Sequence, residues 1–387
     1  MNYISQLRLK NWRNFQELDV ALGDRVFVIG PNASGKSNLL DAFRFLGDIC
    51  QESGGGLQGA VRQRDGLKKL RCLSARKDPE VEIEITISRW DRDPAKQEEL
   101  WRYCIGMVDG GNGASVELSR EQVWHRGSQI LNRPDDKDQA DPKRLRQTLL
   151  QQSSANEAFR EIATFLESLR YLHLVPQLVK HASQYVMRTE SPVLNDPSGL
   201  DFMARLAGTE ETKRNEMLAR IEKALAVCVP QFRELKFVHE DGQPHLQVTF
   251  THWRPHGARQ REDQFSDGTI RLIGLFWAVL DEGGTLLLEE PELSLNSDIV
   301  SQIPGLIHGA LIGHPRQIIV STHSFALLSD AGIGLEEVLL LEPNTEGTVA
   351  RNARNLQEAR LLVEGGLTTA EAVMPYARPA DVADLQL

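Results

Sequence analysis

Few cysteines and no long apolar run are present, and these absences narrow the class of protein. The four cysteines are far apart and form no CxxC pair (Cys50, Cys72, Cys104 and Cys228). We therefore predict neither a zinc site nor a disulfide framework. No apolar run reaches the length of about 18 residues that a membrane span needs. The N-terminus also lacks the basic-then-apolar layout of a signal peptide, so we expect a cytoplasmic protein.

An excess of positive charge is missing as well. The net charge of −10 argues against a protein that coats nucleic acid through its overall field. One local basic run lies between Val61 and Lys77 and contains Arg62, Arg64, Lys68, Lys69, Arg71, Arg76 and Lys77. Such a run is usually a solvated face, but it could also contact phosphates.

The residues present include a phosphate-loop pattern, GxxxxGK[ST], at Gly30–Ser37. Backbone N–H groups of such a glycine-rich turn surround phosphates, and the following helix adds its positive N-terminal end. Lys36 can reach the β- and γ-phosphates, and the Ser37 hydroxyl can ligate Mg²⁺. The candidate nucleotide-binding residues are Gly30, Asn32, Ala33, Ser34, Gly35, Lys36, Ser37 and Asn38.

The surroundings of this pattern favour a true phosphate loop over a chance glycine turn. Residues 25–29 read as a short buried strand and residues 38–46 as an amphipathic helix. Ahead of them, Ile4, Leu7 and Leu9 begin an expected edge strand. Between this strand and the next, Arg13 or Phe15 could stack on a purine base, although an ordinary loop with a buried anchor fits equally well.

The middle of the chain is expected to combine strands with a helical insertion. Residues 81–88, 102–108 and 115–124 read as strands of an antiparallel subsheet. The polar, proline-interrupted stretch 132–142 reads as a surface loop. Helical patterns follow at about 143–169 and 200–227 without sustained heptads, so no long coiled coil is expected. A hairpin is predicted over 235–251.

The last third contains continuous apolar runs at 285–288, 317–320 and 338–341, which are typical of parallel strands buried on both faces. Two motifs there could act on a nucleotide. Ser266-Asp267-Gly268 opens an amphipathic helix, where a Ser-x-Gly turn is either an anion site or a common helix cap. Glu289, Glu290 and Glu292 follow the buried run 285–288. Adjacent acids at such a strand end can divide two tasks, since one holds Mg²⁺ through water and the next polarises the attacking water.

Two smaller signals accompany these motifs. Leu293-Ser294-Leu295-Asn296 is expected to form a tight turn beside the acids. His323 stands just past the buried run 317–320, where it could contact the γ-phosphate or orient water. A lone histidine is more often structural, but its place at a strand end favours function.

Together these motifs resemble an ABC-type ATPase head of the soluble branch that includes RecF, the chromosome-maintenance (SMC) ATPases and the OLD proteins. Within that branch the pattern is similar to AAA-family (AAA_21-type) ATPases of bacterial genome-maintenance and phage-defence systems. The resemblance implies an α/β P-loop head of mixed sheet core plus antiparallel β subdomain, with a mainly helical insertion. We expect domain segments at 1–131, 132–233 and 234–387.

The resemblance also implies residue roles. Glu289 would assist Mg²⁺ binding, Glu290 would be the catalytic base, and His323 the switch histidine. Gln177 is the candidate glutamine that senses Mg²⁺. Two heads would meet head-to-tail, so that Ser266, Asp267 and Gly268 of one copy cover ATP bound to the other; transporters usually have glycine in place of Asp267. The expected cofactors are ATP and Mg²⁺.

Three functions compete. The first is an ATP-driven homodimeric switch that controls DNA or a separate, nuclease-like effector, in bacterial anti-phage defence. The second is a DNA-repair clamp, supported directly by the basic run alone. The third, a transporter subunit, is disfavoured because the LSGGQ signature is absent. Leu362-Val363-Glu364-Gly365 resembles the opening of a Toprim nuclease, but no DxD pair follows (Asp381 and Asp384 are three apart). We therefore expect a helix there and no nuclease site.

Overall fold

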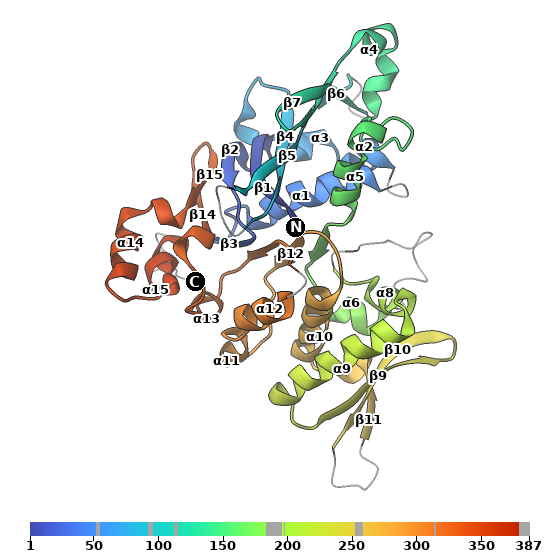
Figure 1. Ribbon diagram of the computed structural model, residues 1–387, viewed down its shortest axis with the longest axis vertical. Helices are drawn as coiled ribbons and strands as arrows, with labels where there is room; N and C mark the ends of the chain where they lie inside the picture. The colour runs from blue at the N-terminus through green and yellow to red at the C-terminus, as the bar shows by residue number, and fades with distance from the viewer. Residues whose placement is uncertain are drawn as a thin grey trace, which may run out of the picture. The chain divides into compact units, whose positions relative to one another are not determined.

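The computed structural model describes residues 1–51, 55–91, 96–111, 115–182, 196, 198–251, 258–312 and 315–378. The chain forms two units, which are described separately (Figure 1). Unit 1 consists of Met1–Leu169, Gly283–Leu287 and Pro315–Leu387, and unit 2 of Arg170–Glu282 and Leu288–His314. One of the boundaries between them falls inside strand β12 (Leu286–Glu289).

An antiparallel sheet in unit 1 has the strand order β2-β1-β4-β5-β6-β7. In β4 the apolar residues Val81, Ile83 and Ile85 are buried and alternate with more exposed polar ones, as predicted. The expectation of β1 as an edge strand is wrong, because β4 pairs with its second side and β2 forms the edge. The bounds are β1 (Asn2–Trp12), β2 (Phe15–Ala21), β4 (Val81–Arg89), β5 (Glu98–Asp109), β6 (Val116–His125) and β7 (Ser128–Arg133).

A second sheet carries the apolar runs that the sequence assigns to buried parallel strands. In unit 1 its order is β15-β14-β3-β13-β12. Strands β13 (Ile318–Ser321) and β14 (Val338–Asn344) both pair in parallel with β3 (Arg25–Ile29), which confirms that prediction. β15 (Gly347–Asn352) pairs antiparallel with β14. The next strand in the order, β8 (Arg170–Leu172), belongs to unit 2 together with the last two residues of β12.

Helix α1 (Lys36–Cys50) is the main helix beside the second sheet of unit 1. Its apolar face is buried, and the fully buried Trp12 packs on Phe45 with ring centroids 5.3 Å apart. The Trp12 Nε1 atom donates to the Asn38 carbonyl at 2.8 Å. The other helices of unit 1 are α2 (Gly56–Arg62), α3 (Leu67–Leu70), α4 (Asp136–Ala140), α5 (Arg160–Glu167), α13 (Phe325–Leu328), α14 (Gln357–Glu364) and α15 (Thr369–Val373).

The polar stretch 132–142 is not the predicted surface loop. It contains α4, which begins with a capping box between Asp135 and Asp138. Arg133 is buried and donates to Asp138 twice at 2.9 Å and to Glu121 at 2.7 Å. Most of the stretch is exposed, as expected, but the polar side chains of Arg133 and Asp138 satisfy each other in the interior, which a composition count does not reveal.

Unit 2 combines a three-stranded antiparallel sheet, of order β11-β10-β9, with helices. The predicted helical stretch 200–227 is split into α8 and α9, and the Glu210 carboxylate caps α9 by accepting from the Thr212 and Lys213 N–H groups. The bounds are α6 (Pro176–Lys180), α8 (Phe202–Gly208), α9 (Glu211–Cys228), β9 (Phe232–Glu240), β10 (Gln243–Phe250), β11 (Ala258–Arg261), α10 (Asp267–Leu280), α11 (Ser297–Val300) and α12 (Ile303–Leu311).

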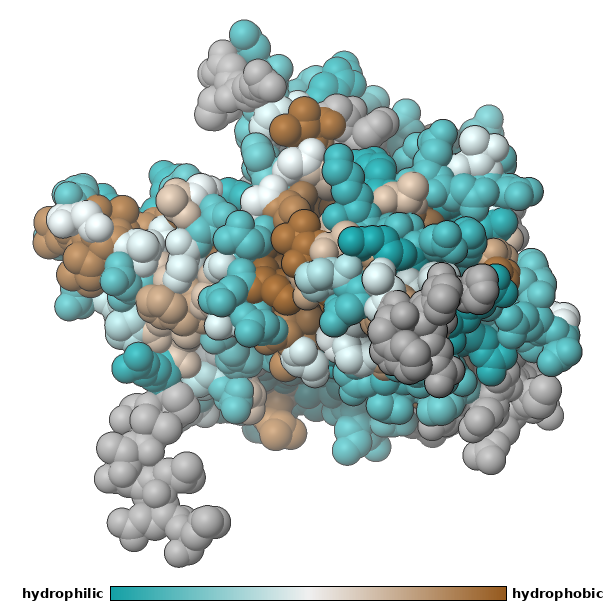
Figure 2. Space-filling model, turned by 90° about the horizontal axis from the view of Figure 1, so that it is seen from below, coloured by the Kyte–Doolittle hydropathy of each residue, from teal (hydrophilic) through white to brown (hydrophobic). Residues whose placement is uncertain are grey.

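The surface is largely hydrophilic, with hydrophobic patches on the face seen in Figure 2. In unit 2 an apolar groove of about 290 Å³ runs between α9, α10 and α12, lined by Ile221, Phe276 and Leu306 among others. Over the described ranges, no helix has the length and apolarity to cross a membrane.

The predicted α/β class is confirmed, since sheets and helices are combined in the described residues and an antiparallel subsheet is present. Segment 132–233 contributes to both units, because α4 and α5 belong to unit 1 whereas α6, α8 and α9 belong to unit 2. The expected division at residues 131 and 233 stays a prediction.

Candidate nucleotide-binding site

The loop between β3 and α1 has the backbone of a phosphate cradle. Gly35 precedes α1 with φ 97°, in the left-handed region that favours glycine. A Cβ on Gly35 would lie 2.1 Å from Asn14 Nδ2, and one on Gly30 would lie 2.5 Å from the Leu341 carbonyl oxygen. The loop therefore keeps its shape only with glycine at both positions, which explains the spacing of the pattern.

Asn14 braces this loop from the turn between β1 and β2. Its Nδ2 donates to the Ser34 carbonyl at 2.8 Å and to Thr348 Oγ1 at 2.7 Å. Its Oδ1 accepts from Asn38 Nδ2 at 2.8 Å. Sequence analysis missed Asn14, because the partners on β15 are more than 300 residues away and only the fold brings them together.

The charged and polar side chains of the loop are arranged for an anion. Lys36 is 6% exposed, and its Nζ donates to the carbonyls of Gly30 at 3.1 Å and Pro31 at 3.2 Å. Helix α1 has no side-chain cap and no acid in its first turn, so its positive end is not neutralised there. Asn32, Ala33 and Ser37 are exposed. Ser34 is buried and its Oγ has no hydrogen-bond partner.

Two arginines hold α1 in place through its acidic residues. Arg13 Nη2 lies 3.1 Å from Asp41, and Arg64 Nη2 lies 2.7 Å from Asp41 and 2.9 Å from Asp48. Burial alone would raise the pKa of Asp41, but the hydrogen bonds and charges of Arg64 and Arg13 outweigh it and lower this pKa. The buried Arg64 is thus not part of an exposed basic face.

Phe15 is fully buried, which does not fit base stacking by this ring.

In unit 2 the Ser266–Gly268 turn opens helix α10. The Ser266 side chain caps the helix by accepting from the Thr269 N–H at 3.2 Å. The Asp267 carboxylate binds Lys180 Nζ at 2.6 Å and accepts from Gln177 Nε2 at 3.4 Å. A Cβ on Gly268 would lie 3.0 Å from the Ser294 carbonyl oxygen. The turn is therefore packed tightly against the loop that follows the acids.

The acids follow β12 as predicted. Glu289, its last residue, accepts a hydrogen bond from the Tyr171 hydroxyl, and His173 Nδ1 lies 3.8 Å from the same carboxylate. Glu290 has φ 44°, an unusual left-handed conformation for a residue with a side chain. Ser294 is also left-handed, with φ 62°. Two such residues close together mark a backbone held by its surroundings, as at many functional sites.

His323 lies in unit 1, two residues after the end of β13, and is half-buried. The next residue, Ser324, caps α13 by accepting from the Leu327 N–H at 3.2 Å. Ser321 is fully buried and its Oγ has no hydrogen-bond partner. The burial of Ser321 holds the start of the loop after β13, and the Ser324 cap holds its end. His323 lies between these two residues.

The predicted site residues divide between the units. Unit 1 holds the phosphate loop, Arg13 and His323, and unit 2 holds Gln177, the Ser266–Gly268 turn and both glutamates. Gln177, the candidate metal sensor, contacts Asp267 on α10. Tyr171 and Lys180 were missed by sequence analysis, although both stand close to the chosen Gln177.

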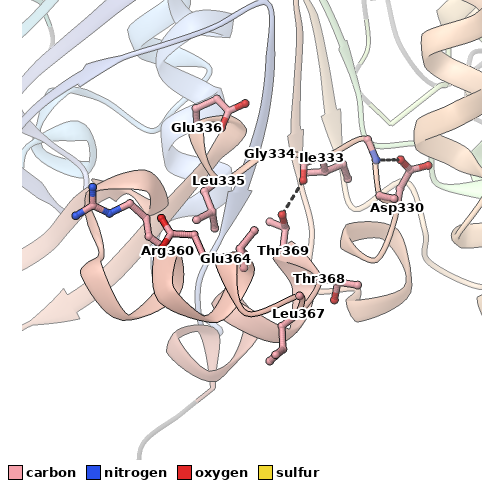
Figure 3. Close-up of a pocket in the computed structure, with 14 residues that line it drawn as sticks. Asp330, Ile333, Gly334, Leu335, Glu336, Arg360, Glu364, Leu367, Thr368 and Thr369 are labelled. Atoms are coloured by element: carbon pink, nitrogen blue, oxygen red, sulfur yellow. Dashed lines mark hydrogen bonds between the residues drawn. The ribbon is translucent and has the colours of Figure 1, made fainter.

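Another hollow, of about 690 Å³, lies in unit 1 beside α14 and α15 (Figure 3). Asp330, Glu336, Arg360 and Glu364 line it. None of the predicted nucleotide-binding or catalytic residues does. Helix α14 includes Leu362, which confirms the helix expected there, whereas Asp381 and Asp384 lie outside the described residues.

The strand–loop–helix of β3 and α1, set in a mixed sheet with paired acids after β12, defines a P-loop NTPase of the ABC ATPase-head class. Residues 25–95 and 117–330 match the family AAA_21, described as "AAA domain, putative AbiEii toxin, Type IV TA system". Because the match spans well over half of the sequence, the chain belongs to this family.

Part of the chain is also similar to the DNA replication and repair protein RecF of Bacillus cytotoxicus. The two are 30% identical over 109 residues, which is 28% of this chain and 29% of RecF. The match thus spans less than a third of this curated relative.

Two solved structures share the fold. The SmcHead bound to the C-winged helix domain of ScpA has a TM-score of 0.55 and 15% identity, covering 90% of this chain and 97% of that one. The Smc head domain from Pyrococcus furiosus, with an extended coiled coil and the C-terminal domain of ScpA, has a TM-score of 0.54 and 14% identity, covering 94% and 99%. The chain therefore has the fold of an SMC head.

Proposed function

We propose that the protein binds and hydrolyses ATP and works as a dimeric switch. The observation that carries the proposal is the phosphate cradle, with Gly35 in a left-handed conformation, a buried Lys36 and the uncapped start of α1. Lys36 now donates to two carbonyls of its own loop, and a triphosphate would offer this ammonium stronger, charged acceptors.

The oxygen donors of the motifs fit Mg²⁺, which prefers hard oxygen ligands. In this proposal Ser37 and Glu289 hold the ion, and Gln177 senses it after leaving Asp267. When bound, Mg²⁺ neutralises charge on the phosphates. The Tyr171 hydroxyl fixes the orientation of the Glu289 carboxylate.

Glu290 is the proposed general base. Its carboxylate takes a proton from a water molecule, whose oxygen attacks the γ-phosphorus while the bond to the oxygen of ADP breaks. His323 contacts the γ-phosphate or orients this water. The products are ADP and phosphate.

We place the Ser266–Gly268 turn over the ATP of a second copy. The N-terminal end of α10 and the Ser266 hydroxyl, which caps it, can face a γ-phosphate. ATP binding would then close the dimer, and hydrolysis would open it.

Glu290→Gln tests this proposal. The variant keeps the side-chain size but cannot accept the proton, so we expect ATP to trap dimers that appear in sizing chromatography and analytical ultracentrifugation. Lys36→Ala in the same background is the control and should remain monomeric. A Glu290→Gln protein that stays monomeric at saturating ATP contradicts the shared site.

The switch is proposed to control a separate effector in the cytoplasm of a bacterium, as part of anti-phage defence. The family description, which names a toxin–antitoxin system, supports this role. Co-purification from native cells with and without ATP tests it, because an effector under ATP control should be captured in one nucleotide state only.

DNA is the second candidate target. Arg62, Lys68 and Lys69 are exposed in unit 1, and the partial similarity to RecF points to DNA replication and repair. Duplex DNA should then stimulate ATP hydrolysis, and binding should weaken steeply with salt. If duplex DNA neither stimulates ATP hydrolysis nor binds in a salt-sensitive way, DNA is not the target.

A further inference from the structure

Lys180 and Asp267 form a close ion pair at the start of helix α10. Lys180 Nζ lies 2.6 Å from Asp267 Oδ1. The Lys180 side chain is only 11% exposed, whereas that of Asp267 is 44% exposed. The lysine is thus committed to this contact, and the carboxylate remains at the surface beside Ser266 and Gly268.

A carboxylate at this position has two opposite effects. It favours α10, since a negative charge stabilises the positive end of a helix. It disfavours a triphosphate at the same end, because two anions repel each other. Arg271, one turn further along α10, adds positive charge near Asp267 but also faces Glu290 and Glu292. Lys180 is the cation in hydrogen-bonding contact with the carboxylate.

We propose that Lys180 is a positioning residue for phosphate binding by the Ser266–Gly268 turn. It pairs with Asp267, cancels the negative charge and directs the carboxylate toward α6, so that the turn can accept the triphosphate bound by a second copy. This inference rests on the proposed shared site. Asp267, which replaces the glycine usual in transporters, is tolerated because the chain supplies its counter-charge.

Two substitutions test the inference in the Glu290→Gln background. The first removes the cation of the ion pair, and the second removes the carboxylate charge that is then unpaired. Lys180→Ala leaves Asp267 unpaired, so we expect ATP-driven dimerisation to weaken about tenfold or more. Adding Asp267→Asn should restore it to within about threefold, because the uncompensated charge is gone. Binding of a fluorescent ATP analogue to the monomer should not change, since the phosphate loop is intact.

Lys213→Ala is the matched control, because Lys213 also forms an ion pair in unit 2, 3.3 Å from Glu282. It should dimerise like the parent, and Lys180→Arg should retain most of the function. Thermal melts of all variants show whether they are folded.

Three results would overturn the inference. The first is undiminished dimerisation of the Lys180→Ala variant. The second is a loss that Asp267→Asn does not repair, which would mean that Lys180 acts other than by neutralising this carboxylate. The third is a parent Glu290→Gln protein that remains monomeric with ATP. That outcome removes the proposed shared site, and the inference with it, before Lys180 is changed.

Discussion

The side-chain amide of Asn14 occupies the space that a Cβ on Gly35 would need. That Cβ would lie 2.1 Å from Asn14 Nδ2 and 2.4 Å from its Oδ1. The glycine thus permits both the left-handed turn and the approach of the amide that ties the loop to β15. The shape of the phosphate loop depends on a residue outside the motif.

Replacing Asn14 tests this dependence. Asn14→Ala removes the hydrogen bonds to the Ser34 carbonyl, Thr348 and Asn38, so the loop loses its brace. At about 1 kcal/mol for each bond, we expect ATP affinity to fall roughly tenfold to a hundredfold. Fluorescent-nucleotide titration measures it. The exposed Asn132→Ala is the control, and equal affinities for both variants would contradict the role of Asn14.

Gly268→Ala separates ATP binding from dimer formation. Its Cβ would lie 3.0 Å from the Ser294 carbonyl oxygen, which is too close without a shift of the backbone. In the Glu290→Gln background we expect ATP-driven dimerisation to weaken about tenfold, while ATP binding to the monomer persists.

Gly309→Ala is the matched control for this variant. It lies on α12 in the same unit, and a Cβ there would meet no atom within 4 Å. It should dimerise normally. If the two glycine variants dimerise equally well, close packing at Gly268 is not required for dimerisation.

Tyr171→Phe should change the magnesium requirement. The variant removes the hydroxyl that donates to Glu289 and leaves the ring. Groups that orient a metal ligand typically contribute about tenfold to a hundredfold in metal affinity. We expect the Mg²⁺ concentration for half-maximal ATPase rate to rise by about tenfold. Tyr376→Phe, which loses a hydroxyl contact to Glu358, is the control. If the Mg²⁺ dependence of the ATPase rate is unchanged, Tyr171 does not contribute to Mg²⁺ binding.

The buried Arg133 cluster predicts a pH-dependent stability. The hydrogen bond from Arg133 is the largest influence on Asp138 and lowers its pKa to about 2, below the value of about 3.9 in an unfolded chain. The ionised form therefore stabilises the fold above pH about 4, and this contribution is lost as the pH falls toward 2. Asp138→Asn should cost roughly 3 kcal/mol at pH 7, and the difference from wild type should shrink below pH about 4.

Urea denaturation at several pH values measures this difference. Asp136→Asn, on the exposed side of α4, is the control and should cost little at any pH. A difference between wild type and Asp138→Asn that does not change with pH would show that the charge of Asp138 is not what stabilises the cluster.

Local patterns predicted the elements of this fold better than their mutual contacts. The phosphate loop was recognisable because the spacing of Gly30, Gly35 and Lys36 is set by one turn. The strands β4, β13 and β14 were recognisable because period-two alternation and continuous apolar runs follow directly from burial of one or both faces.

Residues that act across long sequence separations left no such pattern. Nothing in the sequence distinguishes Asn14 from other polar residues, because its role depends on contacts with β15 and α1 that only the fold creates. The Tyr171 hydroxyl contacts Glu289, which is 118 residues away in the sequence. Arg133 was assigned to solvent, because composition does not reveal that Glu121 and Asp138 enclose it. Physical partners, rather than residue types, decide these roles.

Strand β12 is only four residues long and belongs to both units. Leu286 and Leu287 are buried in unit 1, and the chain enters unit 2 at Leu288, immediately before Glu289. The paired acids therefore follow directly on a strand whose preceding residues are fixed by burial, so a substitution at Leu286 or Leu287 would reach them along the backbone.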